Sequence, residues 1–363
     1  MEMALACAHA ATGLSEPNPR VGCVLTDAHG HVIGQGHTQQ AGGPHAEVMA
    51  LRDAAARGLP TAGATAYVTL EPCSHHGRTG PCCDALIAAG IRRVVAACTD
   101  PNPLVAGQGL ARLQAAGVEV EVGAGGAESQ ALNIGFFSRM VRGTPWVRMK
   151  MAASMDGVTA LHNGASQWIT SPEARADGHA WRKRAGALLT GIGTVLADNP
   201  RLDVRLVATP RQPDLVIVDS QLETPLNGAL WDVPRRVWIY GAADHPERRA
   251  ALQARGAEVT LLPNPHGKVD LAAVMRDLGQ RGINELHVEA GYKLNGSLLR
   301  EGLVDEVLLY LAPKLLGPGL GLANLPELTA LAQGVTLQWQ DATRIDPDLR
   351  LLARLPQRVS WAA

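Results

Sequence analysis

Residues 70–84, "LEPCSHHGRTGPCCD", contain three cysteines and two histidines in fifteen positions. Upstream, the stretch "PHAEV" places His45 two residues before Glu47. Zinc favours thiolate sulfur and imidazole nitrogen, and a catalytic zinc keeps three protein ligands and one open position. His45, Cys73 and Cys82 together therefore predict a zinc site that leaves room for a water molecule.

Glu47 lies close to this predicted site without being an expected ligand. Two thiolates and one neutral imidazole would balance the charge of a zinc ion, which lowers the pKa of a water in the open position. A carboxylate two residues after His45 can take a proton from that water and deliver it to a leaving amine. His-x-Glu followed by Pro-Cys and a second Cys is the signature of zinc base deaminases, with a usual gap of about two residues. Here eight residues separate Cys73 from Cys82.

A structural zinc site is the alternative interpretation. Structural sites usually take four ligands arranged as two close pairs, whereas Cys82 and Cys83 are adjacent, so only one of them can easily face the ion. We therefore favour a catalytic site. His75 and His76 lie in the loop beside it, which favours contact with substrate over metal ligation, with solvent exposure as the alternative. The remaining thiols of this region are expected to be buried: Cys23, Cys83 and Cys98.

Composition narrows the class of protein. The chain has 363 residues, which suggests two or three domains at about 150 residues each. Apolar residues make up 46% and charged residues 18%, so the chain can build ordinary cores. A net charge of -1 without long basic runs argues against nucleic-acid or membrane surfaces and favours a small-molecule substrate. The six cysteines all lie in the first hundred residues, which favours a reduced compartment over a disulfide framework. The N-terminus lacks the basic start of a signal peptide, and no apolar run is long enough to span a bilayer, so we expect a cytoplasmic protein.

Two α/β domains are predicted to position these residues. Strands and helices alternate in the first, which we assign to residues 1–143, and the pattern restarts in residues 144–363. The first is expected to contain a helix at its N-terminus, a hairpin (21–26 and 31–38), strands 64–70, 92–98 and 118–123, and helices 45–58, 81–90 and 109–117. The second is expected to contain strands 186–191, 213–220, 235–241, 257–263, 283–291 and 304–313, and a hairpin after residue 335.

Several long segments resemble one family. "EPNPRVGCV", "AGGPHAEVMAL", "ATAYVTLEPCSHHGRTGPCCDALIAAGIRRVV" and "TDPNPLVAGQGL" are similar to the bacterial riboflavin-biosynthesis deaminase–reductases, the RibD family. The resemblance continues through "KMAASMDG", "SQWIT", "TGIGTVLADNPRLDVR" and "VEAGYKLNGSLL", so it covers nearly the whole chain. The eight-residue gap between the cysteines is this family's form of the deaminase motif.

The resemblance implies a bifunctional enzyme. A cytidine-deaminase-like α/β/α domain with a mixed sheet, residues 1–143, would use zinc to deaminate 2,5-diamino-6-(5-phosphoribosylamino)pyrimidin-4(3H)-one to 5-amino-6-(5-phosphoribosylamino)uracil. A dihydrofolate-reductase-like α/β domain, residues 144–363, would then use NADPH to reduce the ribosyl group to ribityl. The implied roles are zinc ligation for His45, Cys73 and Cys82 and proton transfer for Glu47. Assembly into a homo-oligomer is also expected.

The resemblance also implies site residues in the second domain. Cofactor contacts are expected from Ala152, Trp168, Thr194, Asp198, Ser220, Gly291, Tyr292, Lys293, Leu294, Asn295, Gly296 and Ser297. Substrate contacts are expected from Ser166, Arg182, Leu202, Arg205 and Glu289. Further substrate contacts are Asn18, His37, His75 and His76 in the first domain and Lys150 in the second.

Physical chemistry supports part of this assignment. "GIGTVL" (191–196) does not complete a glycine-rich dinucleotide fingerprint, so a Rossmann-type site is not indicated. Backbone N–H groups at the helix start in 291–297 suit cofactor phosphates, although an ordinary strand–helix turn would look the same. Arg182 and Arg205 suit a phosphate because a guanidinium binds it with two parallel hydrogen bonds; a solvated surface arginine is the alternative. Trp168 could equally be a core residue.

Two other functions remain as alternatives. A zinc nucleoside or tRNA-base deaminase fused to an unrelated domain would share the metal motif, but a tRNA substrate calls for a basic surface that a net charge of -1 does not provide. A non-catalytic binding protein stapled by zinc would have no use for Glu47 beside His45. Both features favour the bifunctional enzyme.

Overall fold

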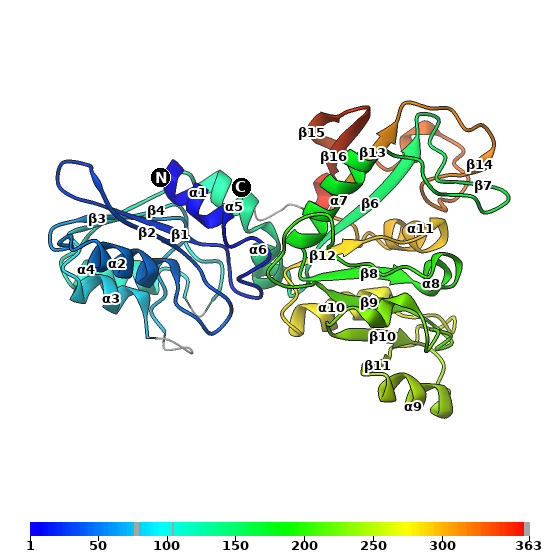
Figure 1. The fold of residues 1–363 in the computed structure, drawn as a ribbon, viewed down its shortest axis with the longest axis horizontal. Helices are drawn as coiled ribbons and strands as arrows, with labels where there is room; N and C mark the ends of the chain where they lie inside the picture. The colour runs from blue at the N-terminus through cyan, green and yellow to red at the C-terminus, as the bar shows by residue number, and fades with distance from the viewer. Residues whose placement is uncertain (76–79, 104, 359–363) are drawn as a thin grey trace. The chain divides into compact units, whose positions relative to one another are not determined.

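The computed structural model describes residues 1–75, 80–103 and 105–358, and the chain divides into two units, Met1–Gly143 and Thr144–Ala363 (Figure 1). Each unit has its own sheet with helices packed on it. Both are therefore α/β structures, as the alternation in the sequence predicts. None of the helices in the described part of the chain is long and apolar enough to cross a bilayer.

The first unit is built on a mixed sheet of order β2-β1-β3-β4-β5. β1 and β2 form the predicted hairpin, β3 runs antiparallel to β1, and β3, β4 and β5 are parallel. The strands are β1 Gly22–Thr26, β2 Val32–His37, β3 Thr65–Val68, β4 Arg93–Ala96 and β5 Glu119–Val122. The helices are α1 Glu2–His9, α2 Ala46–Ala56, α3 Cys82–Ala88, α4 Gln108–Ala115, α5 Gly126–Leu132 and α6 Ile134–Arg142.

This topology brings the segments that carry chemistry to one edge of the sheet. Parallel strands end at the same edge, so the segment after β3, with Cys73, and the segment after β4, with Asp100, are neighbours. Helix α2 packs on β1 and β2. Its buried face includes small side chains at helical spacing, which lets the helix lie close to the sheet: Ala46, Ala50 and Ala54. The first turn of α2, with Glu47, is thereby fixed near the same edge.

The second unit has a larger mixed sheet of order β11-β10-β9-β8-β12-β6-β13-β16-β15 and a small β14-β7 ribbon. The first seven strands in that order are parallel, and β13, β16 and β15 are antiparallel neighbours. The strands are β6 Trp146–Ser154, β7 Ala160–Leu161, β8 Ala187–Gly191, β9 Asp214–Val218, β10 Val237–Gly241, β11 Ala257–Leu261, β12 Glu285–Val288, β13 Glu306–Ala312, β14 Gly319–Leu320, β15 Gln338–Ile345 and β16 Asp348–Arg354. The helices are α7 Pro172–Arg184, α8 Ile192–Asp198, α9 Pro246–Ala254, α10 Leu271–Gln280 and α11 Tyr292–Arg300, with short 3-10 turns at Ala229–Asp232, Leu331–Gln333 and Pro356–Arg358.

The central strands of this sheet are buried on both faces, which explains their nearly continuous apolar sequences. One core cluster joins the sheet to α10 through Val274, Met275 and Leu278. A second cluster, on other residues of the same strands, includes Val195 of α8 and Leu252 of α9. The predicted strands and the C-terminal hairpin are confirmed, with ends that shift by a few residues.

Three expectations about buried thiols are confirmed, and one part of the first unit differs from expectation. Cys23, Cys83 and Cys98 are buried. The sequence analysis predicts no helix in residues 126–142, where the structure has α5 and α6. This segment contains good helix formers, among them Ala127, Gln130 and Leu132, and the buried Phe136 and Phe137 anchor α6 in the core.

A buried ion network underlies α7 in the second unit. Arg148 of β6 donates from Nη1 to Glu285 at 2.8 Å and from Nε to Glu306 at 2.6 Å. The guanidinium also lies 4.5 Å from the ring centroid of Trp181. Arg148 and both carboxylates are almost fully buried, so each charge depends on its partners.

We predict that Arg148→Ala lowers the free energy of unfolding of the second unit by up to about 3–5 kcal/mol, because two buried ion pairs are broken and only Arg184 remains beside Glu285 and Arg354 beside Glu306. The matched control is Arg344→Ala, which removes an exposed ion pair with Asp346 and should change stability by less than about 1 kcal/mol. All seven tryptophans lie between residues 146 and 361, so tryptophan fluorescence during urea unfolding reports on this unit alone. Equal shifts of the two variants would contradict the prediction.

Candidate functional site

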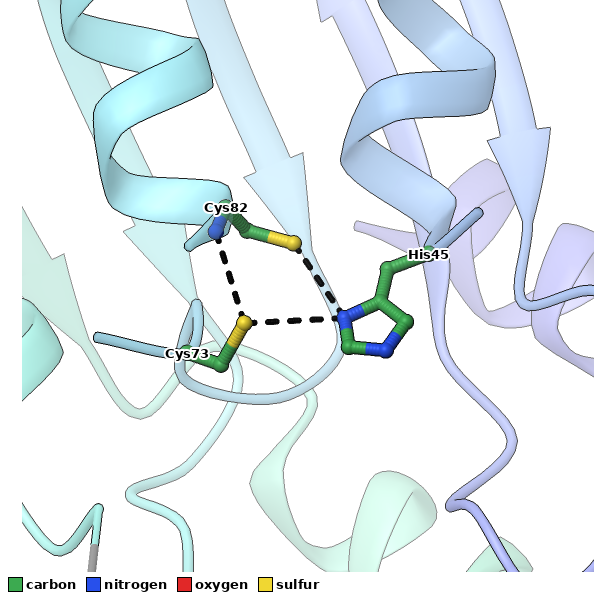
Figure 2. Close-up of side chains that lie close together, drawn as sticks. All are labelled: His45, Cys73 and Cys82. Atoms are coloured by element: carbon green, nitrogen blue, oxygen red, sulfur yellow. Dashed lines mark hydrogen bonds between the residues drawn. The ribbon is translucent and has the colours of Figure 1, made fainter. Parts of the chain in front are cut away.

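Three predicted metal ligands converge from three different elements of the first unit. His45 is the residue immediately before α2, Cys73 follows β3, and Cys82 is the first residue of α3. His45 Nδ1 lies 3.5 Å from Cys73 Sγ and 3.3 Å from Cys82 Sγ, and the Cys82 backbone N–H donates to Cys73 Sγ at 3.4 Å (Figure 2). The imidazole Nδ1 edge and both sulfurs point toward one another.

The geometry and chemistry of this group fit a zinc ion. The three ligand atoms all lie within 4.8 Å of one another. Zn–S bonds of about 2.3 Å and Zn–N bonds of about 2.0–2.1 Å in a tetrahedron place a sulfur and a nitrogen ligand about 3.5 Å apart. The observed nitrogen–sulfur separations of 3.3 and 3.5 Å match that value. No fourth protein ligand joins this group in the part of the chain described, as a site with an open position requires.

The local electrostatics favour a thiolate at this site. The pKa of Cys73 is lowered to about 4, first because the Cys82 thiol donates a hydrogen bond to its sulfur and also because His45 and the Cys82 N–H approach it. Donation of that hydrogen bond to Cys73 raises the pKa of Cys82, and burial adds to the rise. A sulfur that is readily ionised is the form that binds a metal.

Glu47 lies in the first turn of α2 and is 3% exposed. Burial raises its pKa to about 7, and the charge of Cys73 adds to the rise. The carboxyl group lines the same cavity as His45 and Cys73. It is therefore beside the ligand group and in contact with the space that a substrate would occupy.

This cavity has a volume of about 430 Å³, and all of its described lining residues belong to the first unit. Asn18 and His75, two of the predicted substrate contacts, line it. His37 ends β2 and is not among the described residues that line the cavity, and His76 lies outside the described residues. The described lining residues are Pro17, Asn18, Pro19, Val21, Thr38, Ala41, Gly42, Gly43, His45, Glu47, Leu70, Glu71, Cys73, His75, Asp100, Asn102, Val105, Phe136, Arg139 and Met140.

Several polar residues of this cavity were not predicted from the sequence, among them three acidic or amide residues and one arginine. Glu71, Asp100 and Asn102 follow the parallel strands β3 and β4, and Arg139 comes from α6. Burial raises the pKa of Asp100 to about 6. The position of Asp100 and Asn102 after a buried strand is the signal that could have identified them, since sites form at the carboxyl ends of parallel strands.

Predicted substrate residues of the second unit gather around a second charged cluster. Arg182 of α7 donates from Nε and Nη2 to the two oxygens of Glu289 at 2.5 and 2.8 Å. Lys150 Nζ lies 3.9 Å from the same carboxylate. Burial acts to raise the pKa of Glu289, but the charges of Arg182 and Lys150 outweigh it and hold the pKa well below its usual range. Glu289 is thus a fixed negative charge between two cations.

Arg205 and Leu202 join this cluster through Asp203. The Arg205 guanidinium pairs with the Asp203 carboxylate at 2.5 Å, while Arg182 donates to the Asp203 carbonyl at 2.8 Å. Leu202 adopts a left-handed backbone with φ of 49°. Of the predicted substrate residues, Ser166 makes none of these contacts among the described residues and lies in the segment after β7.

Some predicted cofactor residues are brought together where α8 and α11 begin. Gly291 precedes α11, and a Cβ built on it would lie 3.6 Å from Thr194 Oγ1 of α8. The remaining predicted residues of this segment lie in the first two turns of α11: Tyr292, Lys293, Leu294, Asn295, Gly296 and Ser297. Burial raises the pKa of Asp198, the last residue of α8. The first N–H groups of α11 have no partner within the helix, which suits an anionic group.

The other predicted cofactor residues are more dispersed. Ala152 lies on β6 opposite Tyr310 of β13. Trp168 is 61% exposed and carries the guanidinium of Arg175 at 4.4 Å from its ring centroid, so it is not a core residue. Ser220 follows β9 and accepts the backbone N–H groups of the segment after β10. With most of its surface exposed, the side chain of Trp168 is accessible to a ligand on the face that Arg175 does not cover.

Comparisons with known proteins agree for the two halves of the chain. A family model described as the RibD C-terminal domain matches residues 145–351, and one described as the cytidine and deoxycytidylate deaminase zinc-binding region matches residues 1–98. The riboflavin biosynthesis protein RibD of Escherichia coli K12 is 45% identical, covering 97% of both chains. RibD of Aquifex aeolicus is 41% identical, covering 90% of this chain and 89% of its own.

Solved structures give the same result. RibD of Acinetobacter baumannii, form 1, is 39% identical with a TM-score of 0.88, covering 97% of both chains. The diaminohydroxyphosphoribosylaminopyrimidine deaminase/5-amino-6-(5-phosphoribosylamino)uracil reductase of Thermotoga maritima is 31% identical with a TM-score of 0.85, covering 98% of this chain and 97% of its own. The predicted fold class, a cytidine-deaminase-like part followed by a reductase-like α/β part, is confirmed.

The adjacent cysteines at the start of α3 provide a matched test of the metal site. We predict that Cys82→Ala reduces bound zinc from about one per chain to nearly none after dialysis, because only two ligands remain. Cys83→Ala should keep the zinc, since its sulfur lies against the Pro72 and Gly109 carbonyls instead. Elemental analysis of the purified variants measures both, and retention of zinc in Cys82→Ala would contradict the assignment.

Proposed function

The chain belongs to the RibD family, and from this premise we propose how its residues carry out the two reactions of that family. It is a bifunctional enzyme of riboflavin biosynthesis, with a deaminase and a reductase activity, and its cofactors are zinc and NADPH. Residues 1–143 would form the deaminase domain and residues 144–363 the reductase domain. The alternative of a base deaminase fused to an unrelated domain is not favoured, because the RibD relatives match both halves.

The deaminase substrate that we propose is the one in the name of the Thermotoga maritima relative, a diaminopyrimidine with a phosphoribosylamino group. Water would replace one ring amino group, giving the uracil form and ammonia. His45, Cys73 and Cys82 would hold the zinc, which supplies a Lewis acid and makes water nucleophilic near neutral pH. The observation that carries this assignment is the meeting of three ligand atoms within 4.8 Å of one another beside the cavity that Glu47 lines.

Glu47 would move the protons of this reaction. Its carboxylate can take a proton from the attacking water and deliver it to the departing nitrogen, which leaves as ammonia. Burial beside His45 keeps bulk water from competing for that proton. Asn18 and His75, which line the cavity, would contact the substrate, and the same role is proposed for His37 and His76.

For the reductase we propose that NADPH delivers a hydride to the ribosyl carbon while the protein positions both reactants. The start of α11, residues 291–297, would hold cofactor phosphates through its free N–H groups, with Thr194 and Asp198 of α8 beside it. Ala152, Trp168 and Ser220 complete the proposed cofactor residues.

The substrate of the reductase would bind at the charged cluster around Asp203. Arg205 and Arg182 would contact the phosphate or ribosyl oxygens, and Glu289, held as an anion by Arg182 and Lys150, would accept hydrogen bonds from ribosyl hydroxyls. Ser166 and Leu202 are the remaining proposed substrate contacts. Cytoplasmic location and assembly into a homo-oligomer are part of the proposal, in keeping with thiols that are all free in the structure.

The direct test of the proposed function supplies the phosphorylated diaminopyrimidine together with NADPH. Ammonia release and loss of NADPH absorbance are followed in the same sample. Both should occur, and ammonia should appear first. NADPH consumption without ammonia release would contradict the proposed order of reactions.

We predict that Glu47→Gln keeps about one zinc per chain but lowers the rate of ammonia release by about 10²–10⁴-fold, because the amide cannot carry the proton. Reduction of the deaminated intermediate, supplied directly, should be unchanged. Zinc analysis and the two assays distinguish a lost proton carrier from a lost fold. Undiminished ammonia release in this variant would remove Glu47 from the mechanism.

We also predict that Arg205→Ala raises the KM of the reductase by about tenfold or more, because a charged hydrogen bond to substrate is lost. Arg201→Ala is the matched control, since Arg201 pairs with the same Asp203 carboxylate but is not a proposed substrate contact. Ammonia release should be normal in both variants. Equal effects on reduction would show that Arg205 acts only through Asp203.

A further inference from the structure

One buried carboxylate in the first unit has no role in the proposed mechanism. Glu71 lies between β3 and the ligand Cys73 and is 4% exposed. Its Oε2 accepts the backbone N–H groups of Asp100 at 3.1 Å and Gly107 at 2.9 Å. Its Oε1 accepts those of Gly109 at 2.9 Å and Leu110 at 3.4 Å. We call these four bonds the Glu71 clasp.

The clasp joins two parts of the site. Its donors belong to the segment that follows β4 and to the first turn of α4, where backbone N–H groups attract a carboxylate. The same segment forms one wall of the cavity through Asp100, Asn102 and Val105. Within the wall, the Asp100 carboxylate accepts the Asn102 N–H at 2.8 Å, and the Asn102 carbonyl accepts the Val105 N–H at 2.8 Å.

The chain is fitted to this close approach at two glycines. A Cβ on Gly109 would lie 1.9 Å from the Pro72 carbonyl oxygen, so any other residue would push α4 away from the Cys73 segment. Gly107 has φ of 82°, a left-handed conformation that few other residues adopt, as its N–H donates to Glu71. Cys83 Sγ fills the remaining space, 3.2 Å from the Pro72 oxygen.

We propose that Glu71 is a positioning residue of the deaminase site, which holds the wall of Asp100, Asn102 and Val105 at a fixed distance from Cys73 and so sets the affinity for substrate. This inference rests on the proposed deaminase function of the cavity. Glu71 acts through backbone groups and needs no contact with the reacting atoms. His45 and Glu47 are held at the start of α2 and Cys82 at the start of α3, and only Cys73 shares a segment with Glu71, so the chemical step should depend on Glu71 less than binding does.

The test is Glu71→Gln in the full-length chain loaded with zinc. The amide NH₂ would face two N–H donors, so one pair of bonds in the clasp is lost whichever way the amide is oriented. The KM for deamination should rise about tenfold or more while kcat stays within about threefold. Bound zinc and reductase activity should be unchanged. Amide hydrogen exchange at two or more of the four donor residues should become faster.

The matched control is Glu121→Gln on β5, which removes an exposed ion pair with Arg93 and lies outside the described cavity lining. It should leave KM, kcat and exchange at the clasp unchanged. Gly107→Ala provides a second variant, because open space surrounds its Cβ and only the backbone conformation is disfavoured. Gly107→Ala should also raise the KM for deamination. If Glu71→Gln does not fold, this variant tests whether the clasp sets the affinity for substrate.

Each outcome bears on the inference. A KM that is unchanged in a folded Glu71→Gln variant, or a fall in kcat at constant KM, overturns the positioning role. Unchanged amide exchange in that variant overturns the clasp itself. If the wild-type chain releases no ammonia, the proposed function fails instead, and the exchange measurement still decides whether Glu71 holds the segment after β4.

Discussion

The contact of one imidazole with two sulfurs is the constraint on which the first unit depends. Each ligand comes from a separate element, so the hairpin, the parallel strands and two helix starts must all be correctly placed before the three atoms can meet. A metal ion bound there would stabilise the assembled unit over the unfolded chain, because the unfolded chain has no preformed site. The reactive centre can therefore form only in the folded unit.

The second unit contains two groups of buried or half-buried arginine–glutamate ion pairs. Arg148 with its two glutamates and Arg182 with Glu289 place guanidinium groups against carboxylates on the face of the sheet that α7 covers. Arg148, Glu285 and Glu306 are buried and stabilise the fold. Glu289 lies near Lys150, and Arg182 donates to the Asp203 carbonyl, so this second group is connected to the proposed substrate residues. The two ion groups are similar in composition, but one is structural and the other lies among the proposed substrate residues.

Motifs made the metal ligands and Glu47 predictable, because their chemistry is tied to residue type and short spacing. The strands of the second unit were predictable because strands buried on both faces are continuously apolar. Helices α5 and α6 were not predicted, although they contain good helix formers such as Ala127, Gln130 and Leu132, because both are short and lie next to the domain boundary. Glu71 was missed because its carboxylate binds backbone groups distant in sequence, which no local pattern reveals. Asp100 was missed although its position after a buried parallel strand is a usable signal. Many proposed cofactor and substrate residues came from family resemblance alone.

The eight residues between Cys73 and Cys82 give this site an evolutionary freedom that a shorter gap would not. Cys73 follows β3, Cys82 begins α3, and the Cys82 N–H donates directly to the Cys73 sulfur, so the ligands contact each other without relying on the length of the gap. Doubling the length of a loop costs only about 0.6 kcal/mol in closure entropy. Selection can therefore lengthen, shorten or rewrite this spacer to suit new substrates while the metal chemistry is inherited unchanged.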